Sequence, residues 1–484
     1  MYRENYINSL QTDLLDLMEN HLTPAALRYG YSDTPLENNI KWRPLILVIG
    51  NYSSGKSTLI NDFIGAPIQA TGQAPTDDSF TVITFDDSVE TDTNIRVTEQ
   101  RDGNYLLSNP EFPFESLKKH GQQFASHFCM KKINASFLRH FAIIDTPGML
   151  DSITKRDRGY DYLQVVGDLA HLADLVLVLF DPHKAGTIRE AHISLRDTLP
   201  AHTFEHRIFY VLNRIDECAS LADLLRVYGT LCWNLSQITG RKDIPPIRLT
   251  YSQHAAEQAH TLQKGASEYL DHLNNQREEL KTVLMQAPKY HLDNLATFLE
   301  THSSRLTHLL EALLAYRRNR RGALVRFLIT GFLLSLPVGG GIILLLSTNG
   351  LPLTPDLLYL SGGGGSAVFF ILWAVFIRQY YLSRFHRRQM KNVDGLTPLE
   401  NQKRKETWQF VKTMVLDYLK KTGGIFPVWM VKQEYAAIKD IAEHETREVR
   451  EALNEINTIK SDMPFEPATP YLQSFDPQNR KESP

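Results

Sequence analysis

The sequence predicts two structural parts: an α/β domain built on a mostly parallel sheet, and an α-helical bundle that carries a hydrophobic hairpin. From residue 42 to about residue 252, short β-branched runs alternate with helical patterns, which is typical of a sheet covered by helices on both faces. After Ala266, leucines recur at the spacing of one helix face. Two uncharged stretches, each long enough to cross a bilayer, interrupt that helical pattern.

The apolar run at residues 45–49 is the predicted strand that defines the first part. It stops at Gly50, and the chain from Gly50 to Ser57 satisfies the phosphate-loop pattern G-x-x-x-x-G-K-[ST]. The glycines allow a tight turn whose N–H groups point into one concavity, at the N-terminus of the helix that begins near Lys56. We therefore predict an α/β P-loop NTPase whose nucleotide is bound by Gly50, Asn51, Tyr52, Ser53, Ser54, Gly55, Lys56, Ser57 and Thr58.

A second motif, Asp145-Thr146-Pro147-Gly148, directly follows the strand predicted at residues 137–144. Ligands of such sheets bind at the carboxyl ends of the strands, where this motif begins. We expect Lys56 to reach the β- and γ-phosphates and the Ser57 hydroxyl to bind Mg²⁺. Asp145 would hold the same ion through water, and the Gly148 N–H would contact the γ-phosphate.

A third motif, Asn213-Arg214-Ile215-Asp216, follows the strand predicted at residues 207–212. The Asp216 carboxylate can accept two hydrogen bonds from guanine, which adenine cannot donate, while the stem of Arg214 covers the base plane. Ser252 would close this base pocket. The alternative is that Asn213 and Asp216 only cap the next helix.

Between the first two motifs lies a polar loop without periodicity at residues 71–79, which we interpret as a switch loop. Its Thr76 would ligate Mg²⁺ only when a γ-phosphate is present, with Thr71 as the competitor for that role. No glutamine follows Gly148 to orient water, so unassisted turnover should be slow. The predicted catalytic residues are Lys56, Thr76 and Ser53, and the predicted magnesium ligands are Ser57, Thr76 and Asp145.

Composition excludes several classes of function. The chain of 484 residues has 52 basic and 55 acidic side chains, a formal charge of −3, which argues against a general nucleic-acid binder. Three cysteines have neither zinc-ligand spacing nor the density of a disulfide scaffold, which suits a reducing compartment. The acidic N-terminal residues do not fit a cleaved signal peptide.

With these motifs in place, the sequence resembles the dynamin superfamily, and specifically its EH-domain (EHD) ATPase and sarcalumenin branch. Three matching words carry the site motifs: GNYSSGKS from Gly50, PTDDSF from Pro75 and DTPG from Asp145. Three further words are not general features of GTPases, namely RGYD, LFDPHK and LRVYGTLCW, which begin at Arg158, Leu179 and Leu225. All six occur in the same order over residues 44–252, so the resemblance is specific.

The resemblance implies a dynamin-type G domain on a helical stalk, in a self-assembling, membrane-remodelling NTPase whose G domains pair across their nucleotide faces. Tyr52 stands where fission dynamins carry a catalytic glutamine, as in EHD proteins, which implies slow hydrolysis. EHD proteins use ATP despite an Asn-Lys-x-Asp motif, and here Arg214 replaces the lysine. The base therefore stays open between GTP, which Asp216 favours, and ATP. After Glu400 we find no EH domain, so the resemblance is to a bacterial-type dynamin-like protein without it.

These patterns predict six regions along the chain. The leucine stripe at residues 266–320, with a joint at Pro288, needs partner helices, which residues 397–421 and 428–459 and the N-terminal helix supply. The predicted regions are N-terminal stalk helices at 1–40, a dynamin-type G domain at 41–260, helical stalk at 261–322, a membrane hairpin at 323–378, returning stalk at 379–462 and a disordered tail at 463–484.

The hairpin prediction rests on residues 327–346 and 357–377, which contain 20 and 21 residues without a charge. Each would span roughly 30 Å as a helix, the thickness of a hydrocarbon core. Arginines cluster outside both stretches and no basic residue lies between them, so the positive-inside rule places both termini and the G domain in the cytoplasm. Glycines in both stretches leave a re-entrant paddle as the rival, and a soluble buried helical hairpin as the plainest alternative.

The predicted function is a membrane-anchored dynamin-like GTPase that self-assembles and remodels membranes, with Mg²⁺ as cofactor and GTP or ATP as substrate. Its predicted partners are the lipid bilayer, whose anionic headgroups the flanking arginines would bind, and further copies of itself, but no nucleic acid. Three alternatives remain: an ATP-specific EHD-like remodelling ATPase, a membrane-tethered regulatory switch without remodelling activity, and a nucleotide-binding scaffold with negligible turnover.

Overall fold

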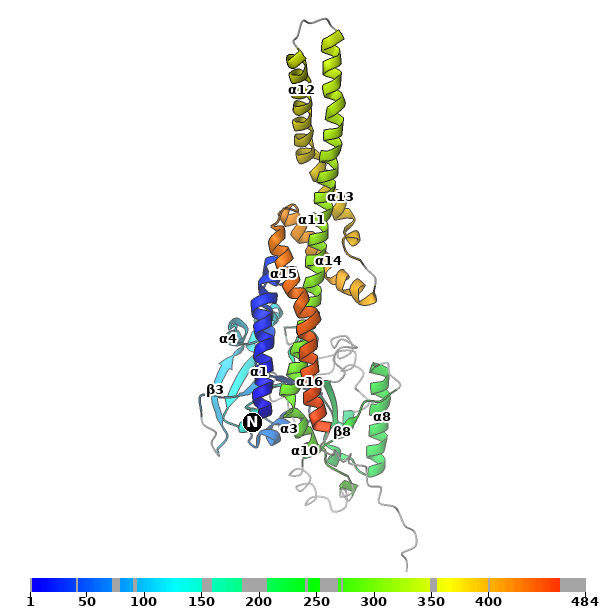
Figure 1. The fold of residues 1–484 in the computed structure, drawn as a ribbon. Helices are drawn as coiled ribbons and strands as arrows, with labels where there is room; N and C mark the ends of the chain where they lie inside the picture. Colours follow the sequence, from blue (N-terminus) through cyan, green and yellow to red (C-terminus); the bar gives the residue numbers. More distant parts are fainter. Residues whose placement is uncertain are drawn as a thin grey trace, which may run out of the picture.

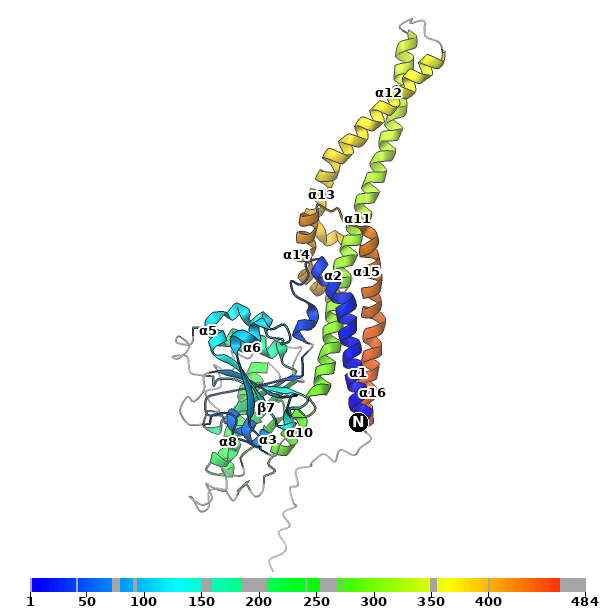
Figure 2. The ribbon, with the colours of Figure 1, turned by 90° about the vertical axis from the view of Figure 1, so that its left-hand side faces the viewer.

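The computed structural model describes residues 2–40, 42–71, 79–89, 94–149, 159–184, 207–239, 243–252, 269–270, 273–348, 355–398 and 401–461. These residues form an α/β domain and a long helical arm that rises beside and beyond it (Figures 1 and 2). Three predictions fall outside the described residues: Thr76 in the switch loop, Arg158 in the RGYD word, and the tail at residues 463–484.

The α/β domain is built on an eight-stranded sheet with the order β3-β4-β2-β5-β1-β6-β7-β8. Strand β1 is parallel to β5 and β6, and β7 and β8 continue the parallel part, whereas β2 is antiparallel to β5 and β3 is antiparallel to β4. The sheet is therefore mixed, with its parallel half around the phosphate loop. The strands are β1 (Leu45–Gly50), β2 (Phe80–Phe85), β3 (Val97–Asp102), β4 (Phe128–Ile133), β5 (Ala142–Asp145), β6 (Leu175–Phe180), β7 (Ile208–Leu212) and β8 (Ile247–Leu249).

The structure corrects the strands predicted from the sequence in two places, both in the half of the sheet that contains β3, β4, β2 and β5. Strands β3 and β4 were not predicted, because β3 has no buried residue and two lysines interrupt the apolar pattern of β4. The edge strand β3 and the half-buried β4 beside it both have residues in contact with water, so both give a weak hydrophobic signal. The strand predicted at residues 137–144 is too long, since Ser136–Leu138 forms a 3₁₀ turn and β5 begins at Ala142.

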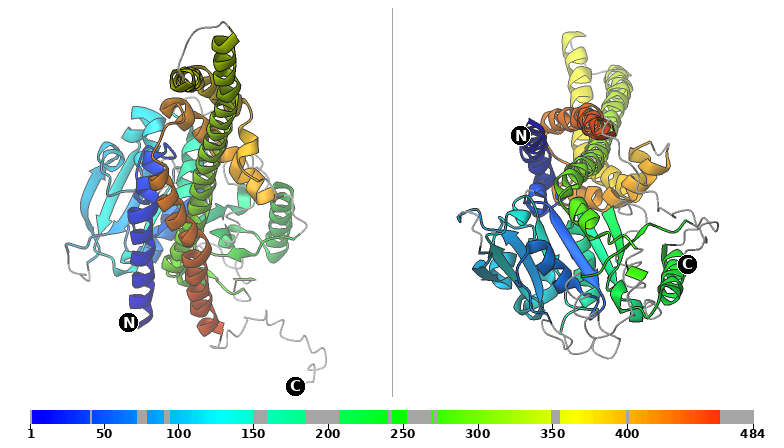
Figure 3. Two further views of the ribbon diagram at one scale, coloured as in Figure 1. Left: turned by 45° about the horizontal axis from the view of Figure 1, so that its top comes forward. Right: turned by 90° about the horizontal axis from the view of Figure 1, so that it is seen from below.

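Two hydrophobic cores lie on opposite faces of this sheet. One face packs against α6 (Tyr162–Leu172), α8 (Leu221–Thr239) and the short helices α4 (Gly103–Ser108) and α5 (Gly121–Ser126). The other packs against α3 (Lys56–Ile64) and α10 (Arg277–Leu284), whose Leu280 and Leu284 are fully buried against it. The view from below shows helices on both sides of the sheet (Figure 3).

A single helix, α11 (Ala287–Thr348), connects the G domain to the far end of the arm. Its 62 residues give a length of about 90 Å at roughly 1.5 Å per residue. Pro288 lies at its second position, so the joint predicted there separates α10 from α11. The helix continues unbroken through residue 322 and includes Pro337.

The stalk core forms around the first half of α11. The N-terminal helices α1 (Tyr2–Leu17), η1 (Met18–Leu22) and α2 (Thr23–Arg28) pack there with α14 (Gln402–Thr422), α15 (Val428–Asp440), η12 (Ile441–Glu445) and α16 (Thr446–Ser461). Helices α1 and α16 both run along α11 (Figure 3). The core therefore joins the two ends of the described chain. Its fully buried side chains include Leu14, Met18, Leu306, Leu313, Val411 and Val415.

The second half of α11 leaves the bundle and packs on α12 (Pro355–Phe376), after which η10 (Ile377–Tyr381) and α13 (Leu382–Lys391) return to the stalk (Figure 1). Glycines permit this close packing: a Cβ on Gly331 would lie 2.0 Å from the Trp373 ring, and one on Gly339 would lie 2.7 Å from the Gly362 carbonyl. Two helices, which contain α11 and α12, are long and apolar enough to cross a membrane.

Candidate functional site

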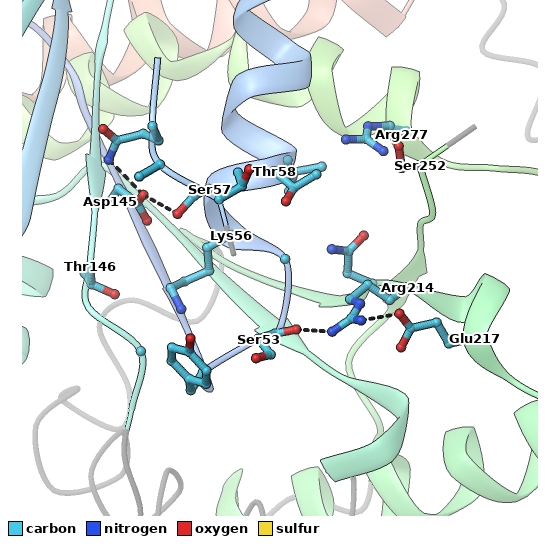
Figure 4. A pocket seen from close by; sticks show the side chains of 18 of the residues that line it. Ser53, Lys56, Ser57, Thr58, Asp145, Thr146, Arg214, Glu217, Ser252 and Arg277 are labelled. Atoms are coloured by element: carbon cyan, nitrogen blue, oxygen red, sulfur yellow. Dashed lines mark hydrogen bonds and ion pairs between the residues drawn. The ribbon is translucent and has the colours of Figure 1, made fainter. Parts of the chain in front are cut away.

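The phosphate loop lies between β1 and α3, as its sequence pattern predicts. Ser53 and Gly55 have φ angles of 64° and 84°, and this left-handed backbone curls the loop around the start of α3. The Lys56 ammonium lies across the loop and donates to the carbonyls of Gly50 and Asn51, each at 3.1 Å. The loop therefore presents backbone N–H groups and one cation to the same space (Figure 4).

Asp145, at the carboxyl end of β5, faces the first turn of α3. Its Oδ2 accepts a hydrogen bond from the Ser57 hydroxyl at 2.8 Å and another from Gln69 Nε2 at 3.0 Å. The register of the sheet explains the meeting, because Asp145 lies opposite Val48, two residues before the loop. The two predicted magnesium ligands that the structure describes are thus in direct contact (Figure 4).

The residues after Asp145 lie against the phosphate loop. The Thr146 hydroxyl donates to the Val48 carbonyl at 2.8 Å, and the Met149 N–H donates to the Gly50 carbonyl at 3.2 Å. A Cβ on Gly148 would lie 2.7 Å from the Cα of Tyr52. Gly148 is therefore needed at this position because the two loops approach too closely for any side chain.

The third motif forms the other end of the site and anchors the phosphate loop. Asn213 donates to the Ser54 carbonyl at 3.0 Å and accepts from the Thr250 hydroxyl at 2.9 Å. A Cβ on Gly55 would lie 2.5 Å from Asn213 Nδ2. Asn213 therefore acts as a bridge between the loop and β8, a role that the base-pocket interpretation did not anticipate.

Arg214 takes a left-handed conformation, and its guanidinium donates to the Ser53 carbonyl and to Glu217 (Figure 4). Its stem lies against Gly55, where an added Cβ would be 3.5 Å from Arg214 Cδ. Asp216 follows in a short 3₁₀ turn, and burial raises the pKa of its carboxyl, with the Glu217 charge adding to the shift. The stem and the Asp216 carboxylate thus lie at one end of the same pocket.

One cavity of about 380 Å³ joins these groups, within the usual range for a small-molecule site. Gly50, Asn51 and Ser54, which were also predicted to bind nucleotide, are not among the residues that line it. The predicted site residues that line it are Tyr52, Ser53, Gly55, Lys56, Ser57, Thr58, Asp145, Gly148, Asn213, Arg214, Asp216 and Ser252.

Eight further residues line the cavity, among them Thr71, the predicted competitor of Thr76; those that were not predicted include Gln69, Thr146, Glu217 and Arg277. The most informative is Arg277, the first residue of α10 in the helical part. Its guanidinium donates to the Tyr251 carbonyl at 2.9 Å and pairs with Asp62 of α3. Burial lowers its pKa, and the nearby Asp62 charge opposes that shift. A side chain from the stalk side of the chain therefore forms part of the wall of the site (Figure 4).

The donor set at the phosphate end fits a magnesium ion. Mg²⁺ prefers oxygen ligands and keeps several waters, so one carboxylate and one hydroxyl beside a phosphate site are the protein groups it requires. Ser57 and the largely buried Asp145 supply that pair. The second predicted hydroxyl ligand, Thr76, lies outside the described residues.

Comparisons with known proteins agree with this geometry. The profile of the Dynamin family matches residues 46–215. EH domain-containing protein 2 of Rattus norvegicus is 32% identical over 249 residues, which are 50% of this chain and 44% of that protein. EH domain-containing protein 1 of Arabidopsis thaliana is 29% identical over 247 residues, 49% of this chain and 43% of the relative. The chain thus spans less than half the length of these curated relatives.

Among solved structures, a bacterial dynamin pair described as oligomerised aligns with 95% of this chain and 75% of its own, at 13% identity and a TM-score of 0.34. The Era protein of Aquifex aeolicus aligns over 55% of this chain and 68% of its own, at 14% identity and a TM-score of 0.28.

The fold and the site define a P-loop nucleotide-binding protein with a dynamin-type G domain. Within that class, the matched G domain is of the dynamin superfamily, near the EHD branch, which confirms the resemblance seen in the sequence.

Proposed function

We propose that this chain is a membrane-anchored dynamin-like GTPase that hydrolyses the β–γ bond of GTP, self-associates and remodels a bilayer. The observation that carries the proposal is the continuous connection between the candidate nucleotide site and the apolar hairpin. One cavity unites the phosphate loop, the Ser57–Asp145 pair and Asp216, and one 62-residue helix leads from the wall of that domain to an apolar hairpin. This continuity supports a mechanism in which nucleotide is bound near one end of α11 and the membrane at the other.

In the proposed complex, the N–H groups of the phosphate loop and the Lys56 ammonium bind the β- and γ-phosphates. Ser57, Asp145 through water, and Thr76 as a nucleotide-dependent ligand would hold a magnesium ion, which would neutralise charge on the phosphates. We assign Ser53, which has a left-handed conformation in the loop, to assist at the γ-phosphate, since no glutamine follows Gly148.

For the base, we favour GTP. The Asp216 carboxylate can accept from both N1–H and the exocyclic amine of guanine, and such a pair gives strong discrimination in a desolvated pocket. The raised pKa of this carboxyl reflects that desolvation. Titration calorimetry with non-hydrolysable GTP and ATP analogues in Mg²⁺ tests the choice. An ATP-specific EHD-like enzyme gives the opposite preference, and binding of neither analogue contradicts the proposal altogether.

Turnover is tested with two variants. Lys56→Ala should abolish nucleotide binding, because the loop loses its only cation, whereas Thr76→Ala should bind nucleotide and fail to hydrolyse it. Single-turnover rates of the unmodified chain serve as the reference. A normal rate in the Thr76 variant contradicts its assignment as a switch residue. A negligible rate in the unmodified chain favours the scaffold alternative.

Membrane attachment is assigned to the hairpin. Its outward side chains are large, apolar and exposed, among them Leu344 at 66%, Leu360 at 75% and Leu372 at 64%. Exposed apolar patches of this extent are not stable in water, and arginines flank both helices on the side of the stalk. Resistance to alkaline extraction tests the anchor. Aqueous labelling of a cysteine at Leu345 from the two sides of the bilayer separates a full hairpin from a re-entrant paddle.

Self-association is assigned to helix α8. Leu221, Leu225, Gly229 and Trp233 are four residues apart and follow one face, on which Leu225 and Trp233 are 62% and 66% exposed. An exposed aromatic and a leucine on one helix face are typical of an interface between copies. Trp233→Ser should lower nucleotide-dependent oligomerisation in sedimentation, and unchanged sedimentation argues against this surface.

A membrane-tethered regulatory switch is the second candidate, because slow turnover suits a signalling state as well as an assembly cycle. Vesicles distinguish the two. Remodelling requires lipid-dependent assembly, tubulation and stimulated turnover, whereas a switch shows none of these and instead changes its affinity for an effector with the nucleotide.

A further inference from the structure

The turn between α14 and α15 carries two large apolar side chains that nothing in the described structure covers. Ile425 is 69% exposed and Trp429 is 68% exposed, while the intervening Phe426 is buried. The turn is held open by Gly423 and Gly424, both with positive φ angles. Ile425 and Trp429 do not belong to the stalk core, because Phe426 is the residue of this turn that packs into that core.

The position of this turn is fixed by α11. Arg320 donates to the Gly424 carbonyl, and the Arg317 guanidinium lies 5.4 Å from the centroid of the Phe426 ring. A Cβ on Gly424 would lie 2.2 Å from the Tyr316 hydroxyl, so the turn is pressed against the helix. The contact occurs at the end of the bundle that faces the hairpin (Figure 2).

The turn therefore lies close to the predicted bilayer surface. The α11 residues that contact the turn, from Tyr316 to Arg320, precede Phe327, the first residue of the uncharged stretch, by eleven to seven positions, which is about 10 to 17 Å along the helix at roughly 1.5 Å per residue. The headgroup layer extends roughly 5 to 8 Å beyond the hydrocarbon on each side of a bilayer. The remaining distance is comparable to the reach of an exposed tryptophan or lysine side chain.

The charge around the turn matches the same surface. Lys420, Lys421 and Lys432 are exposed, and residues 418–433 contain no acidic side chain, while the neighbouring Asp417 pairs with Lys420 at 3.1 Å. Arg318 and Arg321 of α11 are exposed at the same level of the bundle. A tryptophan beside lysines is the composition that proteins place at the boundary between headgroups and hydrocarbon.

We propose that the α14–α15 turn is a second membrane-binding element: Ile425 and Trp429 enter the headgroup region of the bilayer that the hairpin occupies, and the lysines bind anionic headgroups. This inference rests on the proposed membrane anchor. It adds a second point of attachment on a different helix pair, which fixes the tilt of the stalk relative to the bilayer, whereas a hairpin alone leaves the stalk free to pivot.

The test places a polarity-sensitive fluorophore on Ile425→Cys in the full chain, with Cys129→Ser to remove the more accessible native thiol. The protein is reconstituted into vesicles of phosphatidylcholine with about one third phosphatidylserine. Met285→Cys, 62% exposed at the opposite end of α11, is the matched control. We expect a blue-shifted emission at position 425 and roughly fivefold weaker quenching by acrylamide than at position 285.

Equal quenching at the two positions in protein that resists alkaline extraction overturns the inference while leaving the anchor intact. Protein that is fully extracted contradicts the proposed function instead. Protection at position 425 that rises with the protein-to-lipid ratio shows that a second copy covers the turn, which also overturns the inference. In the Lys420→Gln, Lys421→Gln, Lys432→Gln background, the additional protection of position 425 on anionic over neutral vesicles should fall, and an unchanged difference contradicts the role of the lysines.

Discussion

Acidification should weaken the stalk through His302, a half-buried side chain of α11. Its Nδ1 lies 2.8 Å from the Tyr31 hydroxyl, and its ring lies 3.9 Å, centroid to centroid, from Phe298. Burial lowers the pKa of this imidazole to about 4, and the positive charge of Arg305 contributes to the same shift. The neutral ring thus joins the segment after α2 to the stalk.

The sign of the effect follows from the proton balance. Between about pH 6.5 and pH 4, the unfolded chain binds a proton at this position and the folded chain does not, so the free energy of unfolding falls as the pH falls. The full shift corresponds to about 2 kcal/mol at pH 5 relative to pH 7.5. Because the ring is partly exposed, we expect a loss of about 1 to 2 kcal/mol.

The assay is urea denaturation of the detergent-solubilised full chain at pH 7.5 and pH 5, read by helical circular dichroism. His302→Gln keeps an acceptor for Tyr31 and cannot be protonated, so its stability should fall by about 1 to 2 kcal/mol less than that of the unmodified chain. The change in unfolding free energy between pH 7.5 and pH 5 is compared between the variant and the unmodified chain, so the contributions of other titrating groups, such as His308, cancel. His183→Gln, an exposed change in the G domain, is the control. The same pH loss in His302→Gln as in the unmodified chain refutes the reasoning.

Three further outcomes follow from the site and its support. Gly148→Ala should lower nucleotide affinity at least about tenfold in calorimetry, because its Cβ would meet the Tyr52 backbone at 2.7 Å and displace the phosphate loop. Arg277→Ala should weaken nucleotide binding several-fold and leave the circular dichroism spectrum unchanged, because a wall of the pocket is lost and no core side chain is. Asp174→Ala should destabilise the G domain by about 3 to 5 kcal/mol in thermal unfolding, because the Leu45 N–H, His291 and Asn294 lose the buried carboxylate that accepts their hydrogen bonds.

Local patterns explain what the sequence could predict. The phosphate loop and the Asp145 motif are each a continuous run of residues that directly follows a buried strand. The residue types and their order are therefore sufficient to locate both motifs. Gln69 could not be found this way. It reaches Asp145 across 76 positions of sequence, and its backbone is held by Asn61, which binds its N–H and its carbonyl. Such a contact exists only once α3 and β5 are brought together.

Arg214 shows a different limit of sequence reasoning. Its position after β7 was predicted, and its stem lies at the predicted end of the site, beside Gly55. The direction of its guanidinium was not predictable, because the partners are a backbone carbonyl of Ser53 and the side chain of Glu217. The guanidinium of Arg214 thus binds the phosphate loop, which gives this position a structural role in addition to the base contact proposed for its stem. A sequence motif identifies the residue at a position, but it does not show which atoms of that side chain make the contacts.

The start of α11 is where a structural change in the G domain could be transmitted to the helical arm. Asp174, buried before β6, accepts hydrogen bonds from the Leu45 N–H at 2.9 Å, from His291 at 3.0 Å and from Asn294 at 2.6 Å, so one carboxylate joins the start of β1 to the first turns of α11. Burial raises the pKa of the Asp174 carboxyl, but the His291 charge and the hydrogen bonds outweigh that effect, so the pKa is lowered. A protonated carboxyl would bind these three partners less tightly.

Above that joint, α11 has no break over 62 residues, and the contacts of Arg277 with Asp62 and with the Tyr251 carbonyl connect the preceding helix α10 to the nucleotide pocket. A helix packed along half its length moves as a lever rather than bending freely. A tilt of only about 5° at its base would displace its far end by roughly 8 Å over a length of about 90 Å. Small changes at the phosphate end are therefore sufficient to move the hairpin by a distance comparable to a lipid headgroup layer, provided that the Asp174 joint stays closed.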